Sequence, residues 1–376
     1  MIIRITDPMD STASFSETFL ENRYDVISRS GLHSTETQLI RALPLLASPE
    51  TLLILGNRTG VLGMIASRVT QGLAVTTSSM DVFHHHAIER NLARNPFTSV
   101  TSRCESDIPE RDHFDAVCLQ ISKGSMADEL ILDQLQQAQL ALKKGGHLLV
   151  AAEEDIPWLM DHMKQRLGHC SLRERNEGSS LIISQKKKDL KKIKDYRAEF
   201  MMTVPNGLGV KLMTRPGVFA HRRVDEGAQA LAEVAVTRPG DIILDMGCGC
   251  GSIGLSLAVN QPTAEVVFLD SHARATSVTE ANCLANHLAH YQVRLGDQGV
   301  PDESQFSLFV GNPPYYSNDR ISDLFIRTAH HCLKPGGRAY LVAKKAEHNT
   351  TLMKELFGNA HIIRRRGYEI SQSVKS

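Results

Sequence analysis

The sequence predicts an α/β protein of two tandem domains, each a mostly parallel sheet flanked by helices. Short apolar runs of strand length alternate with longer helix-like stretches, which is typical of βαβ units in an open sheet. The two halves of the 376-residue chain also carry matching segments at a constant separation of 191 residues. This separation indicates an internal duplication, so both domains are expected to share one design.

Glycines and asparagines carry the repeat. The matching pairs are Leu52–Gly63 with Ile243–Gly254, Asn91–Asn95 with Asn282–Asn286, Leu142–Gly146 with Leu333–Gly337, and, after a shift of one residue, Phe114–Cys118 with Phe306–Val310. Glycines alone could coincide by chance, but several segments in one register favour a duplication. We divide the chain into a first domain, 1–184, a basic linker, 185–200, and a second domain, 201–376.

The expected strands follow the apolar runs. In the first half they are Leu52–Leu55, Ala74–Thr77, Ala116–Leu119 and His147–Ala151, and in the second half Asp241–Met246, Glu265–Leu269, Gln292–Leu295, Leu308–Gly311 and Arg338–Val342. A helix is expected over Asp323–Cys332, and the Lys334–Gly337 turn should stop it before the last of these strands.

Composition places few limits on function. Lys plus Arg and Asp plus Glu both total 42, so the net charge gives no global sign of nucleic-acid binding. No apolar run reaches the roughly 18 residues of a membrane span, and the N-terminus lacks the features of a signal peptide. The cysteines are scattered apart from Cys248 and Cys250, which predicts no metal site and a reducing, cytoplasmic location. Two tandem copies form an internal pseudo-dimer, so a monomer is expected.

A glycine-rich turn, Asp245-Met-Gly-Cys-Gly-Cys-Gly251, is expected between a strand and a helix. Gly247, Gly249 and Gly251 allow a sharp turn and let a ligand approach the backbone closely. A dinucleotide would place its pyrophosphate at the start of that helix. The acidic Asp245 suits an ammonium group better than a phosphate.

Two further aspartates follow the next strands. Asp270 ends the second strand, where a carboxylate can accept both hydroxyls of a ribose, and Asp297 follows the third, where it can bind the amino group of an adenine. Asp297 could equally be a turn-forming residue. On the glycine turn alone, a nicotinamide dinucleotide and S-adenosylmethionine fit equally well.

The tetrapeptide Asn312-Pro313-Pro314-Tyr315 follows an apolar run of strand length. The side-chain oxygen of Asn312 and the carbonyl of Pro313 can accept the two hydrogens of a planar amine that is about to become positive. The prolines fix the direction of these acceptors, and Tyr315 offers a face on which a base can stack. With the glycine turn, this motif predicts methyl transfer from S-adenosylmethionine to an amide or amine nitrogen.

These motifs and the duplication resemble the ribosomal RNA guanine-N2 methyltransferases of the RsmC/RlmG type, a group of small-domain class I enzymes. The resemblance implies two Rossmann-like domains, of which the first is degenerate and the second catalytic. It also implies S-adenosylmethionine as cofactor and ribosomal RNA as partner. Gly217–Gly227 is similar to a family segment that closes over the cofactor, so Phe219 and Asp225 carry over as cofactor-pocket residues.

Two departures leave the acceptor open. Tyr315 stands where the family often has phenylalanine, and tyrosine is equally common in adenine-N6 and glutamine-N5 enzymes. Val224 replaces the usual leucine. Another RNA base or a protein glutamine therefore stays an alternative, as does a protein that only senses S-adenosylmethionine.

The first copy lacks the chemistry of the second. The counterparts of Asp245, Asp270 and Asn312–Tyr315 are Ile54, Ser79 and Gln120–Lys123. We therefore expect a non-catalytic domain that serves the substrate or the second domain.

Several charged or metal-like patterns are given weaker roles. Six lysines in Gln185–Lys194, and Arg364–Arg366, could meet RNA phosphates or simply be solvated. His84–His86 are consecutive, so on a helix they diverge and do not form a metal site. Glu153–Asp155 is expected to be solvated, and Trp158 to pack in the first core.

Overall fold

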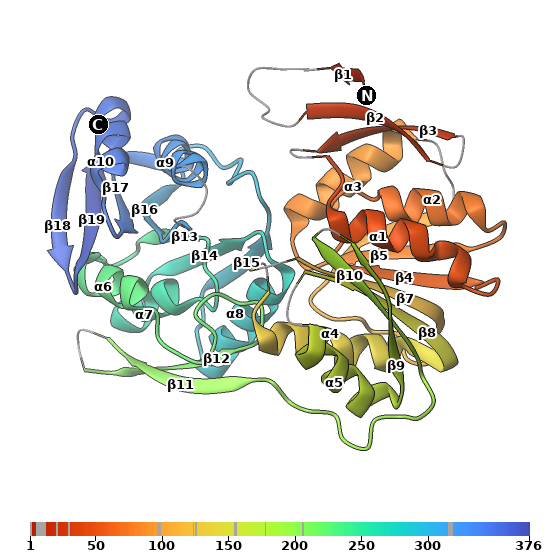
Figure 1. Ribbon diagram of the computed structural model, residues 1–376. Coiled ribbons are helices and arrows are strands. Elements are labelled where there is room, and N and C mark those ends of the chain that lie inside the picture. The colour runs from red at the N-terminus through yellow and green to blue at the C-terminus, as the bar shows by residue number, and fades with distance from the viewer. Residues whose placement is uncertain are drawn as a thin grey trace. The chain divides into compact units, whose positions relative to one another are not determined.

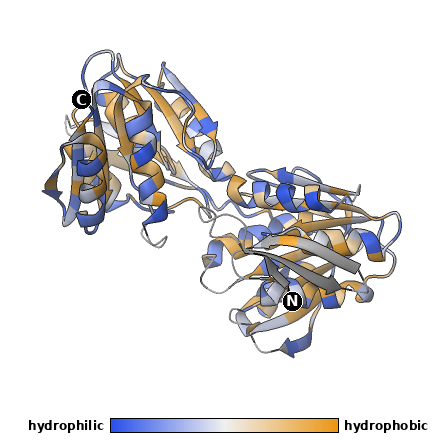
Figure 2. Cartoon of the chain, turned by 90° about the horizontal axis from the view of Figure 1, so that it is seen from above, coloured by the Kyte–Doolittle hydropathy of each residue, from blue (hydrophilic) through white to orange (hydrophobic). Residues whose placement is uncertain are grey.

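The computed structural model describes residues 2–4, 13–19, 22–28, 31–95, 99–122, 124, 126–153, 156–176, 178–204, 207–314 and 319–376. The chain divides into two compact units, Met1–Tyr196 and Arg197–Ser376 (Figure 1). This boundary falls inside the segment that the sequence predicts as a linker. Figure 2 shows hydrophobic residues concentrated in the strands of both units.

The second unit is built on one large sheet. In the described part of the chain its strand order is β15-β14-β13-β16-β17-β19-β18. The strands are β13 (Ile242–Met246), β14 (Glu265–Asp270), β15 (Tyr291–Leu295), β16 (Phe306–Gly311), β17 (Leu333–Ala343), β18 (His361–Arg365) and β19 (Tyr368–Val374). The strands β13 to β17 pair in parallel, and β19 is antiparallel to both of its neighbours. All five strands predicted for this half are confirmed.

Helices cover both faces of this sheet. They are α6 (Glu226–Val234), α7 (Ser252–Asn260), α8 (Ala273–Ala285), α9 (Arg320–Cys332) and α10 (Glu347–Phe357), and a hairpin of β11 (Ala198–Thr203) and β12 (Gly209–Thr214) precedes them. Successive residues of a strand point to opposite faces. Ile243 therefore joins the core under α6, α7 and α8, whereas Leu244 joins the core under α9 and α10 (Figure 1).

The first unit repeats this arrangement. Its main sheet has the order β6-β5-β4-β7-β8-β10-β9, the same order as in the second unit. The strands are β4 (Thr51–Leu55), β5 (Ala74–Ser79), β6 (Val100–Cys104), β7 (Phe114–Ile121), β8 (Leu142–Ala152), β9 (Cys170–Asn176) and β10 (Ser179–Gln185). The shared order confirms the predicted duplication and the α/β fold class.

Helices and a small separate sheet complete the first unit. They are α1 (Ser34–Ala42), the 3₁₀ turn Leu43–Leu45, α2 (Val61–Val69), α3 (Val82–Arg94), α4 (Asp128–Ala141) and α5 (Ile156–Leu167), with the sheet β1 (Ile2–Arg4), β2 (Ala13–Phe19) and β3 (Asn22–Ser28). In the described ranges, none of the helices has the length and apolar character that a membrane span needs.

The repeated asparagines have one structural role in both units. The side-chain amide of Asn91 in α3 donates to the carbonyl of Thr59 at 2.8 Å, and that of Asn282 in α8 donates to the carbonyl of Cys250 at 2.9 Å. Each bond ties a helix to the turn after the first strand of its sheet. Because both asparagines are buried, their amides need such partners, which explains why the repeat is visible at these positions.

Two details differ from the sequence-based expectations. The Lys334–Gly337 turn lies within the first residues of β17 as an irregular start of the strand, with Gly336 at φ 77°, rather than before the strand. Glu153 is half-buried rather than fully solvated, and it accepts a 2.5 Å hydrogen bond from Ser34. Glu154 and Asp155 lie outside the described residues.

Candidate active site

The expected site lies where the strand order of the second sheet reverses. From β13 the chain passes through α7 to β14 on one side, and it later returns to β16 on the other side of β13. Ligands of open α/β sheets bind at this switch point, beyond the carboxyl ends of the strands. Asp245, Asp270 and Asn312 stand at the ends of these three neighbouring strands. The structure therefore brings the main predicted site residues to one edge.

The glycine turn connects β13 to α7 as predicted. Gly247, Gly249 and Gly251 have φ values of 69°, 59° and 77°, in the left-handed region that favours glycine. A Cβ at Gly249 would meet no atom within 4 Å, so its α-carbon faces open space. The amide of Gly249 donates to Asp270 at 2.8 Å, which fixes the turn to the end of β14.

Asp245 is fully buried in this turn. Its Oδ2 accepts a 2.8 Å hydrogen bond from the amide of Gly254, while its Oδ1 is buried with no hydrogen-bond partner in the described part of the chain. Burial, and to a lesser extent the charge of Asp270, raise the pKa of Asp245 to about 7. A buried carboxylate oxygen without a partner is costly in the protein alone. It fits a cofactor that brings a cation or a hydrogen-bond donor to this point.

Asp270 and Asp297 occupy the ends of the next two strands. Backbone amides of Gly249 and His272 donate to the two oxygens of Asp270, each at 2.8 Å, and so orient its carboxylate. A carboxylate oxygen has two lone pairs, and a carboxylate held in this orientation suits the two hydroxyls of a ribose. Asp297 follows β15 and is half-buried. The expected order of aspartates along the sheet edge is thus present.

Asn312 follows β16 directly, and its partner could not be found from the motif. The side-chain amide of Asn312 donates to Oδ2 of Asp225 at 2.9 Å. The same oxygen accepts a 2.7 Å bond from the amide of Ala228 and caps the N-terminus of α6. Because its amide nitrogen is engaged by a carboxylate, the oxygen of Asn312 is directed elsewhere and can serve as an acceptor.

The remaining predicted site residues differ in their burial. Pro313 is buried and Pro314 is half-buried, whereas Tyr315 lies outside the described residues. Phe219 is 63% exposed, and its role in a cofactor pocket stays a prediction. The resemblance implied Asp225 for the cofactor pocket, and the structure adds a direct contact with Asn312.

The equivalent place in the first unit is filled by its own side chains. Glu36 of α1 is buried and accepts bonds from the hydroxyl of Thr59 at 2.7 Å and the amide of Leu62 at 3.1 Å. The hydroxyl of Thr35 contacts Gln120, the counterpart of Asn312, at 3.4 Å. Glu36 thus occupies the turn equivalent to the proposed site, although the side-chain nitrogens of Asn57 and Gln120 are buried there without a hydrogen-bond partner among the described residues.

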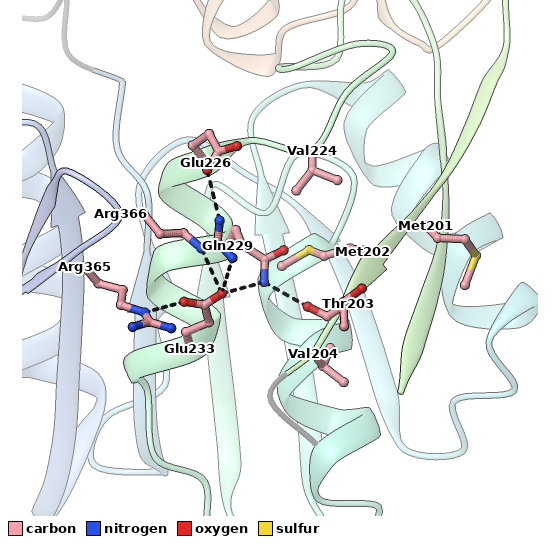
Figure 3. A pocket seen from close by; sticks show the side chains of 10 residues that line it. All are labelled: Met201, Met202, Thr203, Val204, Val224, Glu226, Gln229, Glu233, Arg365 and Arg366. Atoms are coloured by element: carbon pink, nitrogen blue, oxygen red, sulfur yellow. Dashed lines mark hydrogen bonds and ion pairs between the residues drawn. The ribbon is translucent and has the colours of Figure 1, made fainter. Parts of the chain in front are cut away.

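The second unit also has a cavity of about 450 Å³, and its lining does not include Asp245, Asp270 or Asn312. Figure 3 shows it between β11, α6 and the turn after β18, with Glu233 facing two arginines. Arg365 and Arg366 both bind Glu233, and although burial opposes the effect, their hydrogen bonds lower the pKa of that carboxyl. Arg364 binds Glu369 at 3.2 Å. All three arginines suggested for RNA are thus paired with carboxylates of the same unit.

Comparison with known proteins agrees with this geometry. Residues 209–372 match the model of the methyltransferase small domain, a range that includes the glycine turn, the three aspartates and Asn312. The second unit of the chain therefore carries a methyltransferase small domain. The first unit lies outside the matched range, as expected of a copy that has lost the site residues.

Similar proteins cover both units. Ribosomal RNA small subunit methyltransferase C of Shewanella pealeana is 25% identical over 338 residues, which are 84% of this chain and 94% of the relative. Ribosomal RNA large subunit methyltransferase G of Magnetococcus marinus is 27% identical over 259 residues, or 66% and 68% of the two chains. The solved T. thermophilus 16S rRNA N2 methyltransferase RsmC, in complex with AdoMet and guanosine, superposes with a TM-score of 0.78 at 21% identity, covering 96% of this chain and 98% of that chain. This last likeness confirms the two-domain class I methyltransferase fold.

Gly254→Ala is expected to destabilise the proposed site. The matching change in the first unit, Gly63→Ala, should be tolerated better. A Cβ at Gly254 would lie 2.5 Å from the buried ring of Phe268 and 3.0 Å from Oδ2 of Asp245, whereas at Gly63 its nearest contact is 3.3 Å away. Overpacking should cost about 1–3 kcal/mol of unfolding free energy at Gly254 and clearly less at Gly63. Urea unfolding and a cofactor titration test this. Equal effects of the two variants would contradict it.

Asp225→Ser separates a positioning role from a cofactor-pocket role. Serine keeps the N-cap of α6, but its shorter side chain does not carry the carboxylate that holds Asn312. We expect kcat to fall about tenfold with unchanged S-adenosylmethionine affinity, because a hydrogen bond to a charged group is lost. A weaker cofactor affinity with normal kcat would instead favour the pocket role implied by the resemblance.

Proposed function

We propose that this protein transfers a methyl group from S-adenosylmethionine to the exocyclic N2 of a guanine in ribosomal RNA. The observation that carries the proposal is the pairing of Asn312 with Asp225 at the sheet edge that also presents Asp245 and Asp270. The amide oxygen of Asn312, fixed in direction by Asp225, can accept a hydrogen bond from a planar amine. The carboxylates of Asp245 and Asp270 can bind the ammonium group and the ribose hydroxyls of a nucleoside cofactor. The named relatives support ribosomal RNA as the substrate class.

The residues of the second unit would divide the work as follows. S-adenosylmethionine supplies the electrophilic methyl group. Asp245 and Asp270 hold the cofactor from two neighbouring strands, and Asp297 adds a third acceptor. Asn312 and the carbonyl of Pro313 accept hydrogen bonds from the amine, which orients its lone pair and stabilises the positive charge that develops on the nitrogen.

The choice of guanine over other acceptors depends on the relatives more than on the tetrapeptide. The solved RsmC was obtained with guanosine, which supports a guanine acceptor. Adenine N6 and a protein glutamine are the alternatives that Tyr315 leaves open. A monomeric, cytoplasmic enzyme with a first unit that assists the substrate or the second unit completes the proposal.

Methyl transfer to total RNA tests the proposal. RNA from a strain that lacks this gene is incubated with the protein and labelled S-adenosylmethionine, then digested to nucleosides for mass spectrometry. We expect label in N2-methylguanosine and little transfer to RNA from the parent strain, where the site is already methylated. Label in N6-methyladenosine would keep the reaction type and overturn the guanine assignment. No label in RNA with the cofactor bound would point to a protein substrate or a sensor.

A further inference from the structure

The lysine-rich segment that follows β10 is part of the first unit rather than a free linker. Lys186–Tyr196 contains no helix or strand (Figure 1), yet its backbone is held along its length. At its start, the amide of Lys186 donates to Gly146 and its carbonyl accepts from Gly145, both at 2.8 Å. At its end, the buried Tyr196 accepts a 3.2 Å hydrogen bond from Arg166.

Two buried glutamines of α4 fix the middle of the segment. Gln136 both accepts from the amide of Lys194 at 2.8 Å and donates to its carbonyl at 2.9 Å. Gln139, which is fully buried, donates to the carbonyl of Lys188 at 3.0 Å. Buried amides need partners. Gln136 finds both of its partners on this backbone, and Gln139 divides its amide between Lys188 and the carbonyl of Arg166. A flexible tether would remove both bonds of Gln136, so the segment keeps a defined course over α4.

The fixed backbone directs lysine side chains outward. Lys186 is the exception, because it is buried and paired with Asp112 and Asp189. Five other lysines of the segment are exposed: Lys187, Lys188, Lys191, Lys192 and Lys194. Among the described residues none of these five forms an ion pair, and Lys194 lies over the ring of Tyr196. We call these five side chains the lysine ridge.

The ridge differs from the arginines at the end of the second unit. A carboxylate pairs with each of Arg364, Arg365 and Arg366, whereas the ridge lysines have no carboxylate partner in the described part of the chain. Like charges held close together repel one another, which is unfavourable in the free protein. An anionic polymer relieves that repulsion and releases condensed counterions when it binds.

We propose that the lysine ridge binds the phosphate backbone of the substrate RNA and gives the first unit its role. The inference rests on the proposed function. Ordering the backbone in advance lowers the entropy lost on binding, while the lysine side chains stay adaptable to the path of the RNA. Phosphate contacts carry no base identity, so the ridge contributes affinity and register rather than the choice of guanine.

The test replaces Lys187, Lys188, Lys191 and Lys192 with glutamine in the full-length protein, with arginine at the same four positions as the matched control. The probe is ribosomal RNA from the strain that lacks this gene. We expect the glutamine variant to bind this RNA at least about tenfold more weakly, and the slope of log affinity against log salt to fall by roughly 3. The arginine variant should retain both, and S-adenosylmethionine affinity should be unchanged in both variants.

The ridge and the proposed function are contradicted by different outcomes. Unchanged RNA affinity and salt slope in the folded glutamine variant would overturn the ridge. RNA binding is measured without transfer, so it is independent of the proposed reaction. A wild-type protein that binds the RNA through the ridge but makes no N2-methylguanosine would contradict the proposed function alone.

Discussion

Asn312→Ala is expected to lower methyl transfer at least about a hundredfold while leaving S-adenosylmethionine affinity intact. The variant removes the amide oxygen that would accept a hydrogen bond from the amine, an interaction that strengthens as the nitrogen becomes positive. The aspartates proposed to hold the cofactor, Asp245 and Asp270, lie on other strands and are not altered. Single-turnover transfer to RNA, with a separate cofactor titration, measures the two effects.

The first unit supplies a matched control for this variant. Gln120 stands at the position equivalent to Asn312 and is buried, so Gln120→Ala removes a similar amide from the copy that lacks the site aspartates. We expect normal transfer from this control. Full activity of Asn312→Ala would refute its catalytic role, and an equal loss in both variants would indicate a structural effect.

Asp245→Asn is expected to remove most cofactor binding and its dependence on pH. Burial raises the pKa of Asp245 to about 7, so in the free protein the carboxyl is protonated below that pH. A cofactor that brings an ammonium group binds the ionised form, and below pH 7 binding must expel a proton. The wild-type affinity should therefore fall about tenfold for each pH unit below 7, whereas Asp245→Asn should show a weak affinity without this slope.

The same residue affects the stability of the free protein in a defined direction. An aspartate whose pKa is higher in the folded state than its model value of 3.8 binds more protons when folded. Its contribution is therefore favourable at low pH and is lost as the pH rises from about 4 to about 7. The wild type should lose up to roughly 4 kcal/mol relative to Asp245→Asn across this range.

Urea unfolding of both proteins at pH 5 and pH 8, without cofactor, measures the larger part of this relative change, about 3 kcal/mol. Comparing the two proteins cancels the carboxyls whose pKa values are lowered, such as Asp241 and Glu233. A stability difference that does not depend on pH would show that Asp245 is ionised in the free protein.

Much of the site could be predicted from the sequence, because the order of the strands determines which residues meet. Once Asp245, Asp270 and Asn312 are assigned to the ends of parallel strands, the topology of an open sheet brings them to one edge. The duplication is also readable, since buried asparagines such as Asn91 and Asn282 tie the same helix to the same turn in both units.

Contacts between side chains that are distant in the sequence could not be predicted in this way. Asp225 and Asn312 are 87 residues apart, and no periodicity links a helix cap to a strand end. Gln136 lies on α4 like any buried polar residue, and only the fold shows that it holds Lys194. The arginines at 364–366 and the lysines of 186–194 look alike as charge runs. Their different partners become visible only in three dimensions.

The most direct measurement compares two synthetic RNAs that differ at one nucleotide, the one that the nucleoside assay maps as methylated. One RNA carries guanosine there and the other inosine, which lacks only the N2 amino group. We expect the guanosine RNA to accept one methyl group and the inosine RNA to accept none, with equal affinity of the protein for both. Transfer to the inosine RNA at a similar rate would contradict methylation at guanine N2.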